Sequence, residues 1–394
     1  MTTTFFSLLI GDANAMYRTE LVLELKRRTG ALADCGDVLA ICNQEGLPTP
    51  VPAEGAVAVV FCRKPMDAAE IAAINACVAR GTPIIPVVED LAGFTAVTPD
   101  EVSRFNGFQL SDTRDVPELA GLVLELIGLQ RAKRKIFISY ARADAGAIAG
   151  QLRLAFMERW YSVFLDSVSI RPGVLFQNNL REELADSDVV VFLDSPNARG
   201  RRYVDEELAF AGNAGLGGLQ VVWPGLERSR EGSLFTMLKL APNDLETDAR
   251  GVTRLSSAAV QEILRKVAEE RTVVQEKREQ LVFKSIMAYA NREGWDAVSF
   301  LGRHIELRRR QDGRLVRLDV ALGVPTSRDI ERAFTNGEPK PAGEKATEDK
   351  TPEGRLVYNP LGITNVQSRH LRFFRKQLQL HFLDPNAALQ WSIL

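Results

Sequence analysis

The stretch from Tyr203 to Glu207 places an aromatic side chain four residues before a carboxylate, a spacing that could support chemistry. Residues four apart share one face of a helix, so Glu207 would lie beside Tyr203, whereas the adjacent Glu206 would point about 100° away. A carboxylate held beside a reacting centre can stabilise positive charge that develops there. The alternative is an ordinary glutamate at the start of a helix, where it interacts favourably with the helix dipole.

A second group of polar side chains follows the apolar run that begins at residue 136. Ser139, Tyr140 and Arg142 lie at the expected carboxyl end of a strand, which is where ligands bind in open parallel sheets. Arg142 could pair with phosphate oxygens, or it could be a plain surface arginine. Asp166 ends the next apolar run, where an aspartate can also serve as a turn or helix-cap residue.

The composition is that of a globular protein with several domains. The chain has 394 residues, of which 45% are apolar and 25% charged, and its net charge of −2 gives no reason to expect nucleic acid or a membrane as a partner. No apolar run reaches the roughly 18 residues of a membrane span. The spacing of the histidines and cysteines predicts neither a metal site nor a Ser-His-Asp hydrolase, and we expect a reduced, cytoplasmic protein with cysteines in its core. These residues are His304, His370, His381, Cys35, Cys42, Cys62 and Cys77.

Two consecutive regions must position these candidates. Residues 1–130 and 134–255 both alternate continuous apolar runs with helical stretches, and continuous runs suit strands buried on both faces of a parallel sheet. We therefore expect a Rossmann-like α/β domain followed by a second α/β domain whose last strand is 220–224. The two regions could be a duplication of one fold, or they could share only the general α/β pattern. The glycines that follow the Glu207 helix are interpreted as a helix stop and turn; they are Gly212, Gly215, Gly217 and Gly218.

The remainder of the chain has a different pattern. A long helical connector is expected over 256–292, and residues 293–394 predict an α+β region because their apolar residues partly alternate with polar ones. Residues 337–354 contain no large apolar side chain, so we expect a mobile loop there.

Residues 134–255 resemble the Toll/interleukin-1 receptor (TIR) family, whose fold is a flavodoxin-like parallel sheet. The resemblance rests on five features in the family's order. They are the first strand with Phe137, Ser139 and Tyr140, the second strand ending at Asp166, the loop turn Pro172-Gly173, the segment from Ser187 to Pro196, and the stretch from Tyr203 to Leu208.

The resemblance implies an NAD+ glycohydrolase that cleaves the nicotinamide–ribose bond and releases ADP-ribose or a cyclised product, with NAD+ as substrate, no cofactor and no metal. It assigns catalysis to Glu207 and an aromatic contact to Tyr203, where the family has tryptophan, and it places Phe137 near the nicotinamide. Pro172 and Gly173 would lie in a loop that contacts a neighbouring TIR domain, so activity would depend on self-association. Multidomain proteins of this kind often act in antiphage defence, and a protein or nucleotide trigger would be needed.

Two other functions remain open from the sequence. The chain could be a non-enzymatic TIR scaffold that recruits other TIR proteins, which the tyrosine at position 203 mildly favours. Alternatively, residues 1–130, which we interpret as a Rossmann-like or degenerate TIR-like domain, could sense a nucleotide, although they lack the G-x-G-x-x-G fingerprint. The basic segment 366–381 is more simply an amphipathic helix on its own domain than a nucleic-acid surface.

Overall fold

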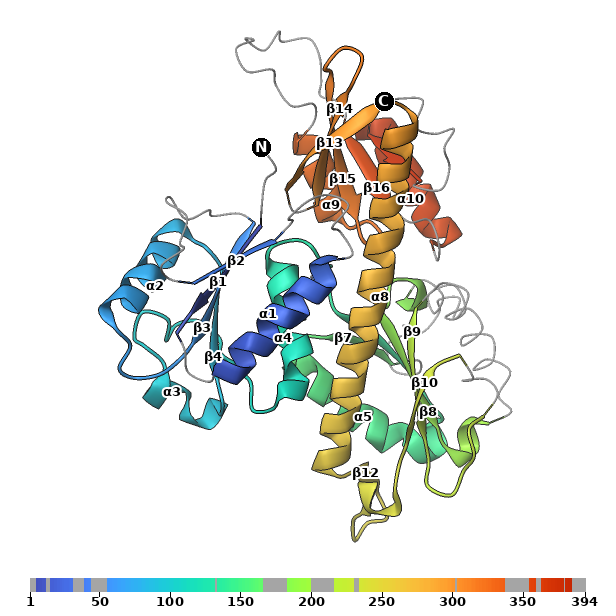
Figure 1. Cartoon of the computed structure of the whole chain (residues 1–394). Helices are drawn as coiled ribbons and strands as arrows, with labels where there is room; N and C mark the ends of the chain where they lie inside the picture. The colour runs from blue at the N-terminus through green and yellow to red at the C-terminus, as the bar shows by residue number, and fades with distance from the viewer. Residues whose placement is uncertain are drawn as a thin grey trace. The chain divides into compact units, whose positions relative to one another are not determined.

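The structure is a computed structural model, and it falls into two compact units (Figure 1). Unit 1 comprises residues 1–132, 279–358 and 378–394, and unit 2 comprises residues 133–278 and 359–377. The residues that the structure describes are 5–11, 15–30, 39–43, 55–131, 133–165, 183–199, 216–229, 234–301, 303–336, 354–358, 363–378 and 380–384.

Unit 1 begins with a parallel sheet of five strands in the order β2-β1-β3-β4-β5. Its central strands are apolar on both faces, because a helix layer covers each face. The strands are β1 (Phe5–Ile10), β2 (Leu39–Asn43), β3 (Ala56–Phe61), β4 (Ile84–Val88) and β5 (Phe108–Gln109).

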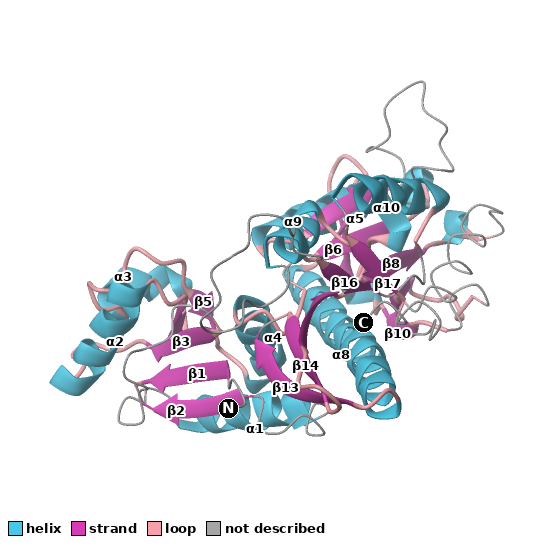
Figure 2. Ribbon diagram, turned by 90° about the horizontal axis from the view of Figure 1, so that it is seen from above, coloured by secondary structure: helices cyan, strands magenta, loops and turns pink. Residues whose placement is uncertain are grey.

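The two faces of this sheet bury alternate residues against different helices. On one face, α1 (Ala15–Gly30) and α4 (Val116–Leu126) lie together, and Leu25 packs in the same buried cluster as Val57 (Figures 1 and 2). On the other face, α2 (Ala68–Arg80) packs Ile74 into a cluster with strand residues. Two short helical elements, η3 (Leu91–Gly93) and α3 (Phe94–Val97), follow β4, and η4 (Thr113–Asp115) precedes α4.

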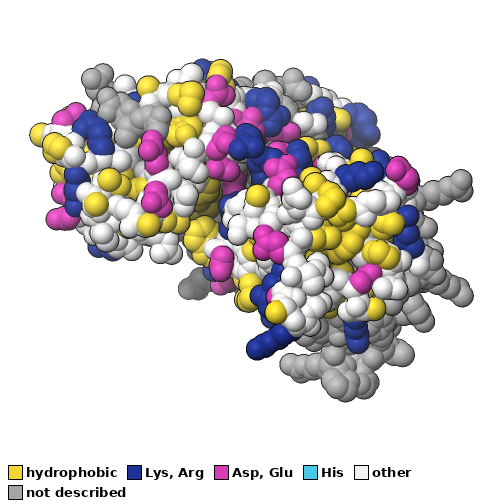
Figure 3. Space-filling view, turned by 90° about the horizontal axis from the view of Figure 1, so that it is seen from below, with side chains coloured by type: hydrophobic (Ala, Val, Ile, Leu, Met, Phe, Trp, Pro, Cys, Tyr) yellow, Lys and Arg dark blue, Asp and Glu magenta, His cyan; other side chains and the backbone are white. Residues whose placement is uncertain are grey.

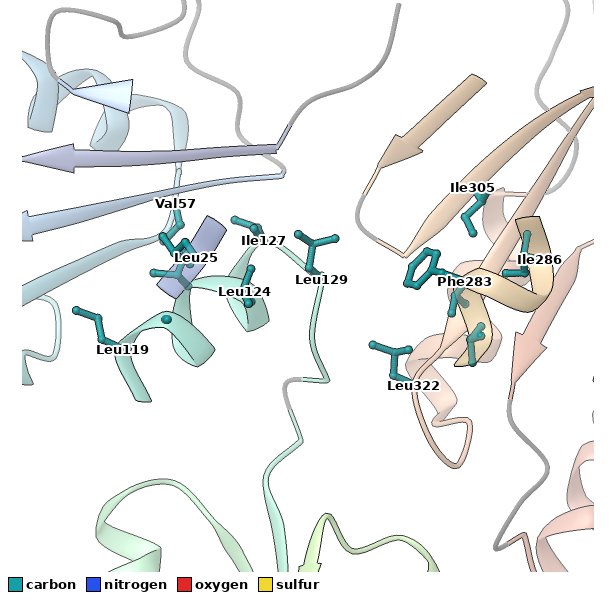
Figure 4. Packing of buried hydrophobic residues seen from close by; sticks show 14 of the residues in the cluster. Leu25, Val57, Leu119, Leu124, Ile127, Leu129, Phe283, Ile286, Ile305 and Leu322 are labelled. Carbon is teal, nitrogen blue, oxygen red and sulfur yellow. The ribbon is translucent and has the colours of Figure 1, made fainter. Parts of the chain in front are cut away.

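A second sheet of unit 1 has the order β13-β14-β15-β16-β17 and is mixed. The pairs β13/β14 and β14/β15 are antiparallel, whereas β15/β16 and β16/β17 are parallel. Figure 4 shows Phe283 and Ile286 of α8 (Ser257–Arg292) close to Ile305 and Leu322 of this region. The other elements are β13 (Trp295–Leu301), β14 (His304–Arg309), β15 (Leu315–Ala321), α9 (Ser327–Asn336), β16 (Arg355–Tyr358) and β17 (His381–Leu383).

Unit 2 contains a parallel five-stranded sheet in the order β10-β9-β8-β6-β7. Read from β7, this is the strand order 2-1-3-4-5 of a flavodoxin-like fold, and the first sheet of unit 1 has the same order. The elements are β6 (Lys135–Ser139), α5 (Arg142–Glu158), β7 (Ser162–Leu165), β8 (Val189–Asp194), η5 (Pro196–Ala198), β9 (Gly217–Val222), β10 (Thr236–Lys239), η6 (Pro242–Asp244), β11 (Leu245–Thr247), β12 (Thr253–Leu255) and α10 (Asn365–Leu378).

The core of unit 2 also divides by sheet face. Ile136 and Ile138 of β6 pack with α5 and with the first part of α8, including Ile263 and Val267. The alternate residue Phe137 packs on the opposite face. Strands β11 and β12 form a separate antiparallel hairpin.

The structure confirms the fold class expected from the sequence and corrects two details. Both α/β regions have parallel sheets, and the region after α8 is α+β. The strand expected over 220–224 is not the last of its sheet, because β10 follows it. Gly217 and Gly218 are buried residues of β9 and not part of a turn. Gly218 is required there because a Cβ atom would lie 2.0 Å from the ring of Phe235.

The sequence-based domain limits remain predictions. The sequence predicts four separate parts, which are residues 1–130, 134–255, 256–292 and 293–394. In the structure, the boundary between the two compact units divides α8 after Arg278, and unit 1 contains both the first parallel sheet and the mixed sheet. The expected mobile loop 337–354 lies outside the described residues except for Gly354. The expected amphipathic helix in 366–381 is α10, which ends at Leu378.

Candidate functional site

Strands β6 and β8 form the topological switch point of the unit 2 sheet. They are direct neighbours, with Ser139 opposite Phe192, while β7 flanks β6 and β9 flanks β8. The connections that leave their carboxyl ends therefore diverge to opposite sides, and ligands of open α/β sheets bind in the crevice formed there. The polar residues expected to bind a ligand after β6 are at this edge.

Phe137 and Ser139 line the interior of one sheet face. Both are fully buried, and Phe137 stacks on Phe164 with ring centroids 5.4 Å apart. Ala198, in the segment that leads toward Tyr203, belongs to the same buried cluster as Phe137. Phe137 can therefore influence a ligand through packing beneath the site and not through an exposed ring.

Tyr140 and Arg142 are placed differently. Tyr140 is buried on the opposite face, within the cluster of α5 and α8, and it lines a groove of about 680 Å³ that runs along α5. Gly146 and Gly150 leave that groove open, since a Cβ atom at either would meet nothing within 4 Å. Arg142 is the exposed first residue of α5, immediately beyond the end of β6.

The other expected site residues lie outside the described part of the structure. They are the catalytic candidate Glu207 and its neighbour Glu206, the aromatic Tyr203, the strand-end Asp166, and the loop residues Pro172 and Gly173. Their roles remain predictions.

A buried carboxylate at the end of β8 is a feature that the sequence analysis missed. Asp194 is fully buried, and both of its oxygens accept from Arg199, with Nε 3.0 Å from Oδ1 and Nη2 3.1 Å from Oδ2. Its Oδ2 also accepts from the Gln220 side chain at 2.9 Å and from the Ser229 backbone at 3.2 Å. Arg228 in turn donates to Gln220 at 3.1 Å.

This network fixes the backbone that leads to the expected catalytic helix. Bidentate arginine–carboxylate pairs are geometrically specific, and the additional donors satisfy the buried charge. The signal in the sequence was an acid that ends an otherwise apolar strand, followed five positions later by Arg199. No sequence pattern, however, indicated that Gln220 of the neighbouring strand β9 would complete the network.

The first sheet of unit 1 has a smaller cavity, of about 280 Å³, at its carboxyl edge. Tyr17, Cys62 and Leu110 line it together with the carboxylates Glu89 and Asp90, and none of its lining residues in the described part is basic. Burial raises the pKa of the Cys62 thiol to about 11, so this thiol is neutral near pH 7. Such a lining disfavours a ligand that carries phosphates.

The described residues include neither a metal-binding cluster nor a membrane-spanning helix. No group of three or more histidine, cysteine or acidic side chains there could hold a metal ion. Among the described helices, none is long and apolar enough to cross a membrane.

Several solved structures resemble the chain distantly. A protein provisionally described as a two-component system response regulator/GGDEF domain protein is 13% identical, with 68% of this chain and 98% of that chain covered and a TM-score of 0.34. A provisionally assigned phosphosugar isomerase from Silicibacter pomeroyi DSS-3 is 11% identical, with coverages of 74% and 88% and a TM-score of 0.21. A provisionally assigned LacI transcriptional regulator from Bacteroides fragilis is also 11% identical, with coverages of 59% and 80% and a TM-score of 0.18. No curated protein matches the chain.

One protein family model matches a part of the chain. The model of the TIR domain family matches residues 136–251, which include the whole parallel sheet of unit 2 from the second residue of β6 onward. The match agrees with the strand order of that sheet and with the resemblance seen in the sequence. Residues 136–251 of the chain are therefore a TIR domain.

Proposed function

We propose that the TIR domain cleaves NAD+ at the nicotinamide–ribose bond, with Glu207 as the catalytic residue. The observation that supports this most is that the stretch from Tyr203 to Glu207 directly follows the segment 194–199, which the Asp194 network fixes at the switch point. In this proposal the flanking regions hold the enzyme inactive in the cytoplasm until a protein or nucleotide trigger drives self-association. The cellular role would be antiphage defence through loss of NAD+ or production of a nucleotide signal.

The chemistry requires one carboxylate and neither a metal nor a cofactor. Nicotinamide is cationic in NAD+, so it departs as a neutral base with the electron pair of the C–N bond and needs no proton. Positive charge then resides on the ribose as an oxocarbenium-like transition state, which the Glu207 carboxylate stabilises. Water adds to the ribose carbon and loses a proton, giving ADP-ribose, whereas an internal nucleophile would give a cyclised product.

The other residues have supporting roles in this proposal. Tyr203 offers an aromatic face to the substrate, and the exposed Arg142 pairs with the diphosphate. Ser139 and Phe137 form the buried floor beneath, while Tyr140 packs behind β6 on the other face. In this proposal Asp166, the residue that follows β7 in the sequence, borders the site, and the loop with Pro172 and Gly173 contacts a neighbouring TIR domain.

The test compares Glu207→Ala with Glu206→Ala. Purified protein is incubated with NAD+, with and without lysate from phage-infected cells, and nicotinamide release is measured. Glu207→Ala should abolish release, and Glu206→Ala should retain most of it because that side chain would face away from Tyr203. Equal rates for wild type and Glu207→Ala under both conditions would defeat the proposal.

A non-enzymatic scaffold is the second candidate, and one surface feature favours it. Leu154 and Met157 of α5 and Trp160, two residues beyond its end, are spaced three residues apart and have exposed fractions of 63%, 49% and 58%. Yellow hydrophobic side chains also reach the surface in several patches in Figure 3. A scaffold should tolerate Glu207→Ala and lose function with Pro172→Ala, whereas the enzyme should fail with the first change.

A further inference from the structure

Asp144 holds the segment after β8 from the side opposite to Asp194. Its Oδ1 accepts from the Ser195 hydroxyl at 2.7 Å, and its Oδ2 accepts from the Asn197 backbone N–H at 2.8 Å. Asp144 belongs to α5, which follows β6, whereas Ser195 and Asn197 follow β8. These two hydrogen bonds therefore join the connections that leave the two strands of the switch point.

The ordinary role of an acid in the first turn of a helix does not account for this geometry. Asp144 is the only acidic residue in the first turn of α5, and its charge there is favourable to the helix dipole. That effect needs no particular partner, and it would be satisfied by a carboxylate in water. Instead, each oxygen has a separate donor, and both donors come from one short segment of another connection.

The segment is thus held at two adjacent points. Asp194 is fixed from β9 and from Arg199, and Ser195, which is fully buried, is fixed from α5. The chain that follows Arg199 leads to Tyr203 and Glu207. Hydrogen bonds to a charged acceptor are stronger than neutral ones, so the Asp144 contacts hold residues 195–197 firmly beside the start of α5.

Asp144 also lies close in sequence to the residue expected to bind the diphosphate. Arg142, the expected partner of the diphosphate, lies two residues before Asp144 at the start of α5. Glu207, the expected partner of the ribose, follows the segment that Asp144 holds. Asp144 therefore joins the start of α5, which carries Arg142, to the segment that precedes Glu207 in the sequence.

We infer that Asp144 is a positioning residue, which holds residues 195–197, the segment that leads in sequence to Glu207, beside the start of α5 and does not touch NAD+ itself. This inference rests on the proposed NAD+ cleavage. Small displacements of a reacting group lower the rate of the chemical step much more than they weaken substrate binding. The role therefore predicts a loss in kcat with little change in KM.

The experiment measures kcat and KM for nicotinamide release by four variants of the full chain. Asp144→Ala should lower kcat by about 10- to 100-fold. Asp144→Asn keeps one accepting oxygen, and Ser195→Ala removes one donor, so both should lose less. The double variant Asp144→Ala/Ser195→Ala should be no slower than Asp144→Ala alone, because the shared hydrogen bond is already absent.

The matched control is Asp248→Ala in the turn between β11 and β12. Asp248 Oδ1 accepts from the backbone N–H groups of Arg250 and Val252 at 2.8 and 3.0 Å, so this change also removes a carboxylate that organises backbone. Its kcat should equal that of wild type. A wild-type kcat in Asp144→Ala, or an equal loss in the control, would overturn the inference.

Hydrogen exchange separates failure of this inference from failure of the proposed function. If the wild type releases no nicotinamide under any condition, the cleavage proposal fails, but the contacts can still be tested. Exchange at the amide of Asn197 and in the segment after it should be faster in Asp144→Ala and Asp144→Asn than in wild type, and unchanged in Asp248→Ala. Unchanged exchange in both Asp144 variants would show that the carboxylate does not hold the segment.

Discussion

Asp188 and Asp194 lie at opposite ends of strand β8, and both carboxylates are fully buried in ion pairs. Asp188, immediately before the strand, accepts from Arg271 at 3.0 Å, Gln275 at 2.9 Å and Arg278 at 3.0 Å. These three partners come from one face of α8, since they are spaced four and three residues apart. Buried hydrogen bonds thus join the amino end of β8 to α8 and the carboxyl end of β8 to residues of the candidate site.

The Asp188 cluster predicts a large loss of stability when its acid is removed. Asp188→Ala would leave Arg271 and Arg278, which are almost fully buried, without their shared carboxylate. Breaking a buried ion pair from one side typically costs about 3–5 kcal/mol. Urea unfolding should show a decrease of that size, against a small change for the exposed Asp248→Ala. A decrease of less than about 1 kcal/mol would mean that water replaces the carboxylate.

Two glycines of unit 2 should respond in opposite directions to the same substitution. Gly218→Ala places a methyl group against the Phe235 ring inside the core, and overpacking of this kind costs about 1–3 kcal/mol. Gly146→Ala adds a methyl group to α5 in open space, where alanine is favoured over glycine by up to about 1 kcal/mol. Thermal unfolding of both variants tests the prediction. Equal effects would show that β9 and Phe235 can separate without cost.

The Asp329 carboxyl predicts acid sensitivity in the second sheet of unit 1. Burial alone would raise its pKa, but Arg303, Arg332 and the hydrogen bonds from Thr326 reverse the shift, so its pKa is below the ordinary 3.8. A lowered folded-state pKa stabilises the fold above pH 3.8, and this contribution is lost as the pH falls through the folded pKa. Asp329→Asn should therefore be less stable at pH 7 and should show a shallower loss of stability below pH 4. If the free energies of unfolding of the two proteins fell in parallel with decreasing pH, the lowered pKa of Asp329 would be contradicted.

The sequence predicted the fold better than it predicted the site because the two depend on different kinds of information. Continuous apolar runs such as 189–193 and the helical pattern of 257–291 are local signals, and both elements appear in the structure. Strand β10 was missed because Thr236–Lys239 is short and mostly exposed, so its residues are not an apolar run. Gly217 and Gly218 were interpreted from local turn propensity, whereas both are strand residues, and Gly218 lies against the ring of Phe235, which is distant in sequence.

In the candidate site, too, some features follow from local sequence and others from residues distant in sequence. The positions of Ser139 and Arg142 at the end of β6 follow from the strand pattern alone. The hydrogen bonds of Asp194 to Gln220 and of Asp144 to Ser195 join residues that are distant in sequence, and no local pattern distinguishes these acids from surface or capping residues. Contacts of this kind depend on strand order, which a single sequence does not encode in any short segment.

Trp160 combines an unfavourable backbone with an exposed aromatic side chain. It follows the end of α5 with φ of 59°, and its backbone N–H donates to Met157 at 3.0 Å while that of Tyr161 donates to Phe156 at 3.1 Å. Glycine is the usual residue in this left-handed position at a helix end, and another residue costs roughly 1 kcal/mol there. The indole is exposed and apolar, and burying it against another copy of the chain would offset this backbone cost.

This arrangement predicts that stability and association respond differently to substitution. Trp160→Gly should raise the free energy of unfolding by about 1 kcal/mol relative to Trp160→Ala, because both lack the indole but only alanine keeps the strained backbone. If the indole contacts another copy, both variants should sediment as smaller species than wild type at the same concentration. Sedimentation and urea unfolding of the three proteins measure both effects. A Trp160→Gly protein less stable than Trp160→Ala would show that the left-handed backbone is not strained, and unchanged sedimentation of both variants would show that the indole does not contact another copy.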